Sequence, residues 1–221
     1  PNAVTPHLDA FAAEGMRFNR AYTTSPQCAP SRASIFAGRS PVALGVTRFT
    51  QPAPPETVFF TDVLREAGYW VGLDGRYHHL AGRVREEPEI VAALEEAGLD
   101  YVQERFDHVN ITGTKGEAGI AQAAKQLGDT LDSVPDGKPF FLYFGFNQPH
   151  RGWGKNLDTE TFNPDKFVLP PDWPDLPEVR EEYGQFLYEV HELDRGFGRL
   201  MEVLDQRGLR EKTIVLFMGD N

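Results

Sequence analysis

The sequence predicts an α/β fold in which helices sandwich a mainly parallel β-sheet. Capped stretches with helical spacing alternate with short apolar stretches, and strand-like stretches follow helix-like ones along the chain. Two stretches, 139–146 and 213–218, are continuously apolar, which is typical of strands buried on both faces. The 221 residues show no internal repeat and no clear boundary to a second domain, so we expect one domain.

The first part of the chain predicts two helix-to-strand units. Residues 5–15 have a threonine cap, a proline in the first turn and a glycine stop, with apolar residues at helical spacing. Residues 16–23 then alternate like a strand. Residues 61–68 predict a second helix ending in glycine, and 69–73 a second strand.

The rest of the chain continues the alternation. Residues 88–98, 119–131 and 178–208 have the spacing of helices, and the two apolar stretches are the remaining strands. Residues 151–177, rich in proline, aspartate and tryptophan, separate a predicted strand from the last helix. A loop of that length is usually functional or a lid.

Composition and charge exclude several classes of function. The chain is 40% hydrophobic and 25% charged, as ordinary soluble globular proteins are. A net charge of -11 argues against general nucleic-acid binding and against adhesion to an anionic membrane. No apolar run reaches the roughly 18 residues of a membrane span, and one cysteine cannot form an internal disulfide, so cysteine usage leaves the compartment open.

The segments that follow predicted strands carry the candidate chemistry. Ligands of doubly wound sheets bind beyond the carboxyl ends of the strands, which here precede residues 23–34, 74–82, 147–153 and 219–221. Cys28 lies two residues before Pro30, a favoured first helical residue, and therefore beside the partial positive charge of a helix N-terminus. Arg32, one turn later, adds a fixed positive charge, so this point suits anion binding.

The pattern Cys-x-Pro-Ser-Arg resembles the signature of the type I sulfatases of the alkaline phosphatase superfamily, and "CAPSRASIFAGRSP" is similar to that motif almost throughout. The stretches "PFFLYFGFNQPHRGW" and "TIVLFMGDN" are also similar to sulfatase segments. The resemblance implies an alkaline-phosphatase-like sulfatase catalytic domain truncated at both ends. Residues 1–221 would be its N-terminal part, with the first strand and the C-terminal part missing. A pair of metal-binding aspartates would precede residue 1.

The resemblance also implies roles for individual residues. Cys28 would be oxidised by a formylglycine-generating enzyme to Cα-formylglycine, whose hydrate is the nucleophile, and Arg32 would hold that hydrate. Asp220 and Asn221, with residue 28, would bind Ca²⁺, a cation suited to oxygen ligands, with Mg²⁺ or Mn²⁺ as alternatives. His150 would contact the sulfate.

One segment departs from the commonest sulfatase pattern, Gly-Lys-x-His-Leu-Gly. Arg76 stands where lysine is usual, which keeps the charge and changes its geometry from a point to a planar fork. Counting from Arg76 favours His78 as the functional histidine, whereas the His-Leu pair favours His79. We favour His79 and keep His78 as the alternative.

The implied reaction releases sulfate without a second nucleophilic attack at sulfur. One hydroxyl of the hydrate attacks sulfur and a histidine protonates the leaving alcohol or amine. The other hydroxyl then loses its proton, which restores the aldehyde and expels sulfate by C–O cleavage. The substrate would be a sulfate ester or N-sulfate of a carbohydrate. Residues 140–151 and 170–204 look most like the heparan N-sulfatase (sulfamidase) branch of the family.

Several alternatives stay open. The same superfamily contains phosphonate and phosphate ester hydrolases, and a sulfatase-like domain could bind sulfated glycans without catalysis. Cys28 could be a small buried hydrophobe, Asp220 and Asn221 ordinary turn residues, and His150 structural. The resemblance favours a periplasmic or secreted location, although no signal peptide is visible in the chain.

Overall fold

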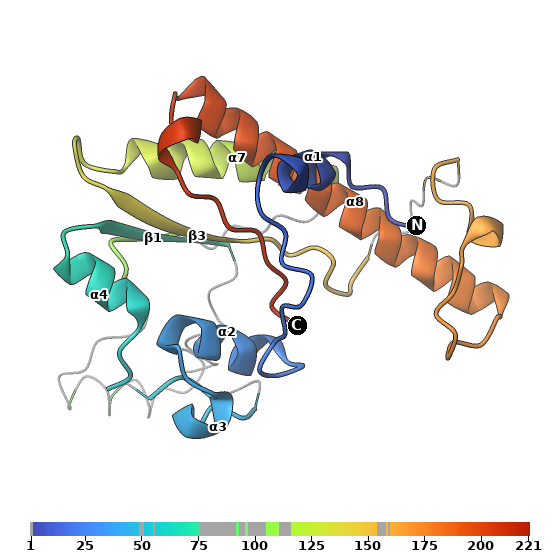
Figure 1. Ribbon diagram of the computed structural model, residues 1–221, viewed down its shortest axis with the longest axis horizontal. Coiled ribbons are helices and arrows are strands. Elements are labelled where there is room, and N and C mark those ends of the chain that lie inside the picture. Colours follow the sequence, from blue (N-terminus) through green and yellow to red (C-terminus); the bar gives the residue numbers. More distant parts are fainter. Residues whose placement is uncertain are drawn as a thin grey trace. The chain divides into compact units, whose positions relative to one another are not determined.

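The computed structural model describes residues 2–48, 51–54, 56–75, 92, 96, 105–110, 116–153, 158 and 160–221 (Figure 1). The chain forms two compact units. The first unit comprises residues 1–17, 113–128 and 146–213, and the second comprises 18–112, 129–145 and 214–221. The helix expected at 88–98 lies almost entirely outside the described residues.

The second unit contains a parallel three-stranded sheet in the order β2-β1-β3. Its strands are β1 (Trp70–Gly75), β2 (His108–Asn110) and β3 (Phe140–Gly145). The register places Gly72 of β1 beside His108 and Leu142. The parallel sheet and the strands predicted near 69–73 and 139–146 are confirmed, although β3 is half-buried along most of its length.

Three helices of the second unit lie on one side of this sheet (Figure 1). They are α2 (Cys28–Ala37), α3 (Pro41–Leu44) and α4 (Phe60–Glu66). Their apolar residues meet alternate residues of β1 in one core, because successive side chains of a strand point to opposite faces. The buried members of that core are Ala33, Phe36, Leu44, Val46, Ala53, Phe59, Val71, Leu73 and Phe106.

The opposite face of β1 carries a small polar cluster. Asp74 is fully buried, and its Oδ1 accepts a hydrogen bond of 3.1 Å from Oγ1 of Thr130, in the last turn of α7 (Gly116–Asp132). Nε2 of His108 lies 3.7 Å from the same carboxylate oxygen. With helices on one face and this turn on the other, the expected α/β class with a flanked parallel sheet is confirmed.

The first unit is helical. It consists of α1 (Pro6–Glu14), most of α7, the short 3-10 helices Pro164–Lys166 and Arg210–Lys212, and α8 (Pro177–Gln206). Helix α1 packs on α8 (Figure 1). The buried carboxylate of Asp194 accepts from the backbone N–H groups of His7 (3.2 Å) and Leu8 (2.7 Å), so it satisfies the first turn of α1 that Thr5 does not cap with its side chain.

A glycine permits this close approach of α1. A Cβ atom on Gly198 of α8 would lie 2.5 Å from Nδ1 of His7, so a larger residue there would push the helices apart. His7 thus has a packing role.

Part of the loop between β3 and α8 packs on α8. Phe162 and Phe167 are buried against Leu187, and Arg180 donates to the carbonyls of Pro164 (2.8 Å) and Phe167 (3.0 Å). Arg180 also hydrogen-bonds the carboxylate of Asp175, which lowers the pKa of that carboxyl. Whether the loop acts as a lid stays a prediction.

The strands predicted at 16–23 and 213–218 are wrong. The structure assigns no strand to either segment: residues 19 and 20 form a turn, and large apolar side chains are exposed, including Tyr22 at 87% and Ile214 at 91%. A strand forms only where a neighbouring backbone accepts and donates its hydrogen bonds, and the sheet of the described residues includes β1, β2 and β3 but neither of these segments. In the described part of the chain, no helix is long and apolar enough to cross a membrane.

Candidate active site

The cysteine motif folds as a helix, a tight turn and the start of the next helix. Helix α2 begins at Cys28 itself, with Pro30 in the first turn, where a missing N–H costs nothing. It ends at Gly38, whose φ of 62° is left-handed and suits glycine. Ser40 then caps α3 by accepting from N–H of Ala43 at 3.2 Å. Cys28 is half-buried and unpaired by any disulfide.

Asp220 lies directly against the first turn of α2. Its carbonyl oxygen accepts a 2.9 Å hydrogen bond from Oγ1 of Thr23 and a second one from Oγ of Ser31. Its carboxylate Oδ2 accepts from Nε of Arg32 at 2.6 Å. Figure 1 shows the C-terminal stretch and the stretch before α2 meeting at this end of the helix. Two segments that the sequence singled out separately, 23–34 and 219–221, are therefore in contact.

The guanidinium of Arg32 is largely buried and only partly used. Its side chain is 10% exposed. Nη1 donates to the hydroxyl of Tyr143 on β3, and the guanidinium carbon lies 5.7 Å from the centroid of that ring. Among the described residues, Nη2 meets no acceptor. An arginine with an unused donor in a semi-buried position can bind an anionic oxygen.

Sequence reasoning missed Tyr143 and Thr23. Tyr143 carries the only side-chain hydroxyl within β3, Phe140–Gly145, and that lone polar group in an apolar strand was the available signal. Thr23 stands five residues before Cys28 in a run of hydroxyl residues, which gave no indication of a contact with residue 220.

Asp220 and Asn221 can provide part of a calcium site. Oδ1 of Asp220 accepts no hydrogen bond from the described residues, and the exposed Asn221 side chain has none with them either. Carboxylate and amide oxygens are the ligands that Ca²⁺ prefers, but it takes six to eight of them. The part of the chain that the structure describes contains no group of three or more His, Cys, Asp or Glu side chains that could hold a metal. These two residues therefore fit calcium as part of a ligand set and not as the whole of it.

Of the other predicted residues, only His150 is described, and its hydrogen bonds are to its own turn. Arg76, His78 and His79 lie outside the described residues. His150 is exposed and lies in the first unit, where its N–H donates to the carbonyl of Asn147 at 2.9 Å. The indole N–H of Trp153 donates to the carbonyl of Pro149 at 2.8 Å and so restrains the turn that carries His150.

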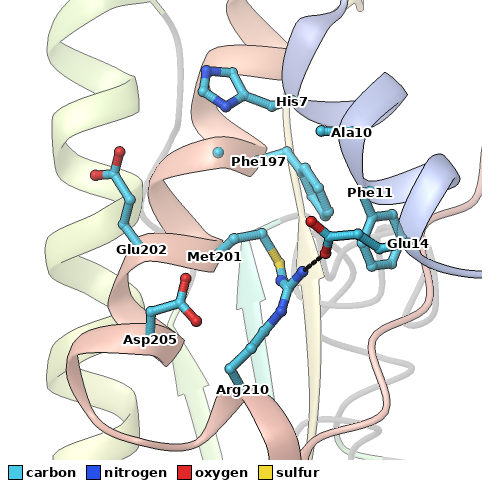
Figure 2. Close-up of a pocket in the computed structure, with 10 residues that line it drawn as sticks. His7, Ala10, Phe11, Glu14, Phe197, Met201, Glu202, Asp205 and Arg210 are labelled. Carbon is cyan, nitrogen blue, oxygen red and sulfur yellow. Dashed lines mark hydrogen bonds and ion pairs between the residues drawn. The ribbon is translucent and has the colours of Figure 1, made fainter.

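A separate pocket lies between α1 and α8 of the first unit (Figure 2). Arg210 pairs with Glu14 at 2.8 Å across it, and the rings of Phe11 and Phe197 meet edge to face at 5.1 Å. None of the predicted site residues lines this pocket. The Arg210–Glu14 pair joins α1 to the 3-10 helix Arg210–Lys212, and we assign the pocket no chemistry.

The chain is similar to known proteins over its whole length. The sulfatase family model matches residues 1–221. An ulvan-active sulfatase of Formosa agariphila is 26% identical over 237 residues, which cover 100% of this chain and 46% of that protein. The N-sulphoglucosamine sulphohydrolase of Homo sapiens is 28% identical over 244 residues, which cover 98% and 45%. The chain thus spans about half the length of the curated relatives it matches.

Solved structures share the fold. A protein in complex with its substrate D-glucosamine-2-N,6-O-disulfate superposes with a TM-score of 0.69 at 18% identity, covering 93% of this chain and 58% of that one. The phosphonate monoester hydrolase of Agrobacterium radiobacter superposes with a TM-score of 0.68 at 15% identity, covering 95% and 56%. At these identities the likeness concerns the fold alone, and it agrees with the α/β class expected from the sequence.

Proposed function

Because this chain belongs to the sulfatase family, we propose that the full-length protein hydrolyses a sulfate ester or N-sulfate of a carbohydrate at a site that includes Cys28, Arg32, Asp220 and Asn221. The observation that carries the proposal is the contact of Asp220 with Thr23, Ser31 and Arg32. It puts a carboxylate with an unused oxygen beside the helix turn that begins at the only cysteine of the chain.

Each residue of the proposed site would have its own role in the reaction. Residue 28, matured to formylglycine and hydrated, would supply the attacking oxygen, and the fixed charge of Arg32 would favour the deprotonated form of that oxygen. Asp220 and Asn221 would hold Ca²⁺, which supplies positive charge to the sulfate oxygens and lowers the pKa of a bound hydroxyl. Arg76 and His79, with His78 as the alternative, would bind the leaving side of the substrate, and His150 would contact the sulfate.

A sulfated carbohydrate is the substrate class that the relatives favour. One of them is named for ulvan and another for N-sulphoglucosamine, and a structural neighbour was solved with a disulfated glucosamine. The chemistry of the turn agrees, since a sulfate group is an anion and Arg32 keeps one donor unused.

Two measurements on the full-length protein test the proposal. Peptide mass spectrometry after co-expression with a formylglycine-generating enzyme should find the Cys28 peptide lighter by about 18 Da, the change from thiol to aldehyde. The matured protein should then hydrolyse N-sulfoglucosamine or a sugar sulfate ester, and the protein expressed without that enzyme should not. Aldehyde at residue 28 without turnover of any sulfate would favour a binding protein.

A phosphonate or phosphate ester hydrolase is the second candidate, because a phosphonate monoester hydrolase shares the fold. The same matured protein should be assayed against a phosphonate monoester. A kcat/KM higher for the phosphonate than for every sulfate tested would replace the sulfatase proposal.

A further inference from the structure

Tyr143 stands apart from the other residues of β3 because its two ends have different neighbours. Its ring packs edge to face on Phe36 of α2, with centroids 5.3 Å apart, and Phe36 is 1% exposed. Its hydroxyl accepts a hydrogen bond from Nη1 of Arg32. The core therefore fixes the ring, and the ring holds the hydroxyl against the guanidinium.

The guanidinium of Arg32 is then held at two points. Nε contacts Asp220 at 2.6 Å and Nη1 contacts Tyr143. Because a guanidinium is planar and rigid, fixing two of its nitrogens fixes the direction of the third. Nη2, which meets no acceptor among the described residues, is thus presented in one orientation.

Residue 28 lies on the same face of α2 as Arg32. Cys28 and Arg32 are four residues apart on α2, and residues at that spacing lie on the same face of a helix. We propose that Tyr143 is a positioning residue, whose hydroxyl holds Arg32 so that Nη2 faces the oxygen of the matured residue 28. This inference rests on the proposed function and adds a residue that the cysteine motif does not contain.

The test compares Tyr143→Phe with Tyr69→Phe in the matured full-length protein. Phenylalanine keeps the ring on Phe36 and removes only the hydroxyl. Tyr69 is a matched control, since it is 37% exposed and its hydroxyl bonds none of the described residues. With 4-nitrophenyl sulfate as the probe, Tyr143→Phe should lower kcat by about 10-fold, as expected for one lost hydrogen bond to a charged group, and change KM by less than about 3-fold. Tyr69→Phe should change neither.

Two further readouts separate positioning from general destabilisation. A displaced guanidinium favours the deprotonated nucleophile less, so the acid limb of the kcat profile should move to higher pH in Tyr143→Phe. In the background of Arg32→Lys, the Tyr143→Phe change should lower kcat by no more than about 2-fold, because the two residues act as a unit. A purely structural role would lower thermal stability and leave the pH profile unmoved.

The outcomes are distinct. If the wild type turns over the probe while Tyr143→Phe matches Tyr69→Phe, or if the losses of Tyr143→Phe and Arg32→Lys multiply, the positioning role is overturned and the sulfatase proposal stands. If the wild type carries the aldehyde and turns over no sulfate, both fail together.

Discussion

The second unit contains two arginine–aspartate pairs that are alike in burial and differ in how fully their carboxylate oxygens are used. The side chains of Arg32 and Asp220 are 10% and 27% exposed, and those of Arg105 and Asp62 are 13% and 23% exposed. Degree of burial therefore does not distinguish the pair of the proposed site from the other pair.

The carboxylate of the Arg105–Asp62 pair is saturated. Oδ1 of Asp62 accepts from Nε of Arg105 at 3.0 Å, and Oδ2 accepts from Nη2 and from the N–H of Phe59 at 2.8 Å. Nη2 of Arg105 also donates to the carbonyl of Thr57 at 2.6 Å, and the guanidinium lies 4.2 Å from the ring centroid of Phe59. The pair joins the start of α4 to the segment before β2, and both carboxylate oxygens are satisfied.

The Arg32–Asp220 pair makes one contact and leaves groups unused. Oδ1 of Asp220 and Nη2 of Arg32 have no partner among the described residues. A charged group that no protein atom uses can bind a ligand without first losing a contact within the fold. An unused carboxylate oxygen on Asp220, and not charge or burial, is what distinguishes the α2 turn from the Arg105–Asp62 pair.

The largest expected effect comes from removing the residue that this pair surrounds. Cys28→Ala should abolish turnover of the matured full-length protein, by about 10³-fold or more, because no nucleophile remains. The free energy of unfolding should change by less than about 1 kcal/mol, since Cys28 is half-buried at a helix start. Kinetics with a sugar sulfate and urea unfolding check the two parts, and turnover that survives in Cys28→Ala contradicts the proposed nucleophile.

Replacing each of the two arginines by lysine should have opposite effects on activity and stability. Arg32→Lys keeps the charge and loses the planar fork, and should lower kcat/KM by about 10²-fold. Arg105→Lys should keep kcat/KM within about 3-fold and lower the free energy of unfolding by about 1–3 kcal/mol, because it leaves part of the Asp62 carboxylate unpaired. Steady-state kinetics and urea unfolding of both variants make the comparison, and the reverse pattern would mean that the saturated pair is the functional one.

Substituting the aspartate of each pair should affect Ca²⁺ affinity differently. Asp220→Asn should weaken Ca²⁺ binding by the full-length protein by about 10-fold or more, because a neutral amide replaces a carboxylate ligand. Asp62→Asn should leave Ca²⁺ affinity unchanged and destabilise the fold. Calorimetric titration decides, and equal Ca²⁺ affinities of Asp220→Asn and the wild type would remove Asp220 from the ligand set.

Sequence reasoning selected two segments, 23–34 and 219–221, that the structure brings into contact, and the site roles of their residues stay a prediction. A local motif pointed to Cys28 and Arg32, and the position after an apolar stretch pointed to Asp220. Such local patterns can be recognised without knowing which distant segments come into contact. The helices at 119–131 and 178–208 were equally accessible, since helical hydrogen bonds are local.

What the sequence could not supply depends on pairing across space. The alternation of 16–23 and the apolar run at 213–218 report a preference for strand, whereas a strand exists only with a hydrogen-bonded neighbour. Tyr143 and Thr23 were missed for the same reason, because their partners, Arg32 and Asp220, are distant in the chain. The Arg105–Asp62 pair could not be predicted from the sequence either, because its two residues are also distant in the chain.

The smallest expected effect tests whether the backbone of Asp220, and not only its carboxylate, must be held. Thr23→Val is nearly isosteric and removes one of the two hydroxyls on the Asp220 carbonyl, while Oγ of Ser31 stays. Loss of one neutral hydrogen bond should weaken Ca²⁺ binding by about 3-fold.

Thr47→Val is the matched control, because the Thr47 hydroxyl bonds the exposed Gln51 side chain at 3.2 Å in the same unit. If calorimetry gives both variants the Ca²⁺ affinity of the wild type, Ser31 holds the carbonyl alone. If only Thr23→Val binds Ca²⁺ more weakly, the hydroxyls of Thr23 and Ser31 both hold the Asp220 carbonyl. The position of the Asp220 carboxylate then depends on Thr23, a residue outside the cysteine motif.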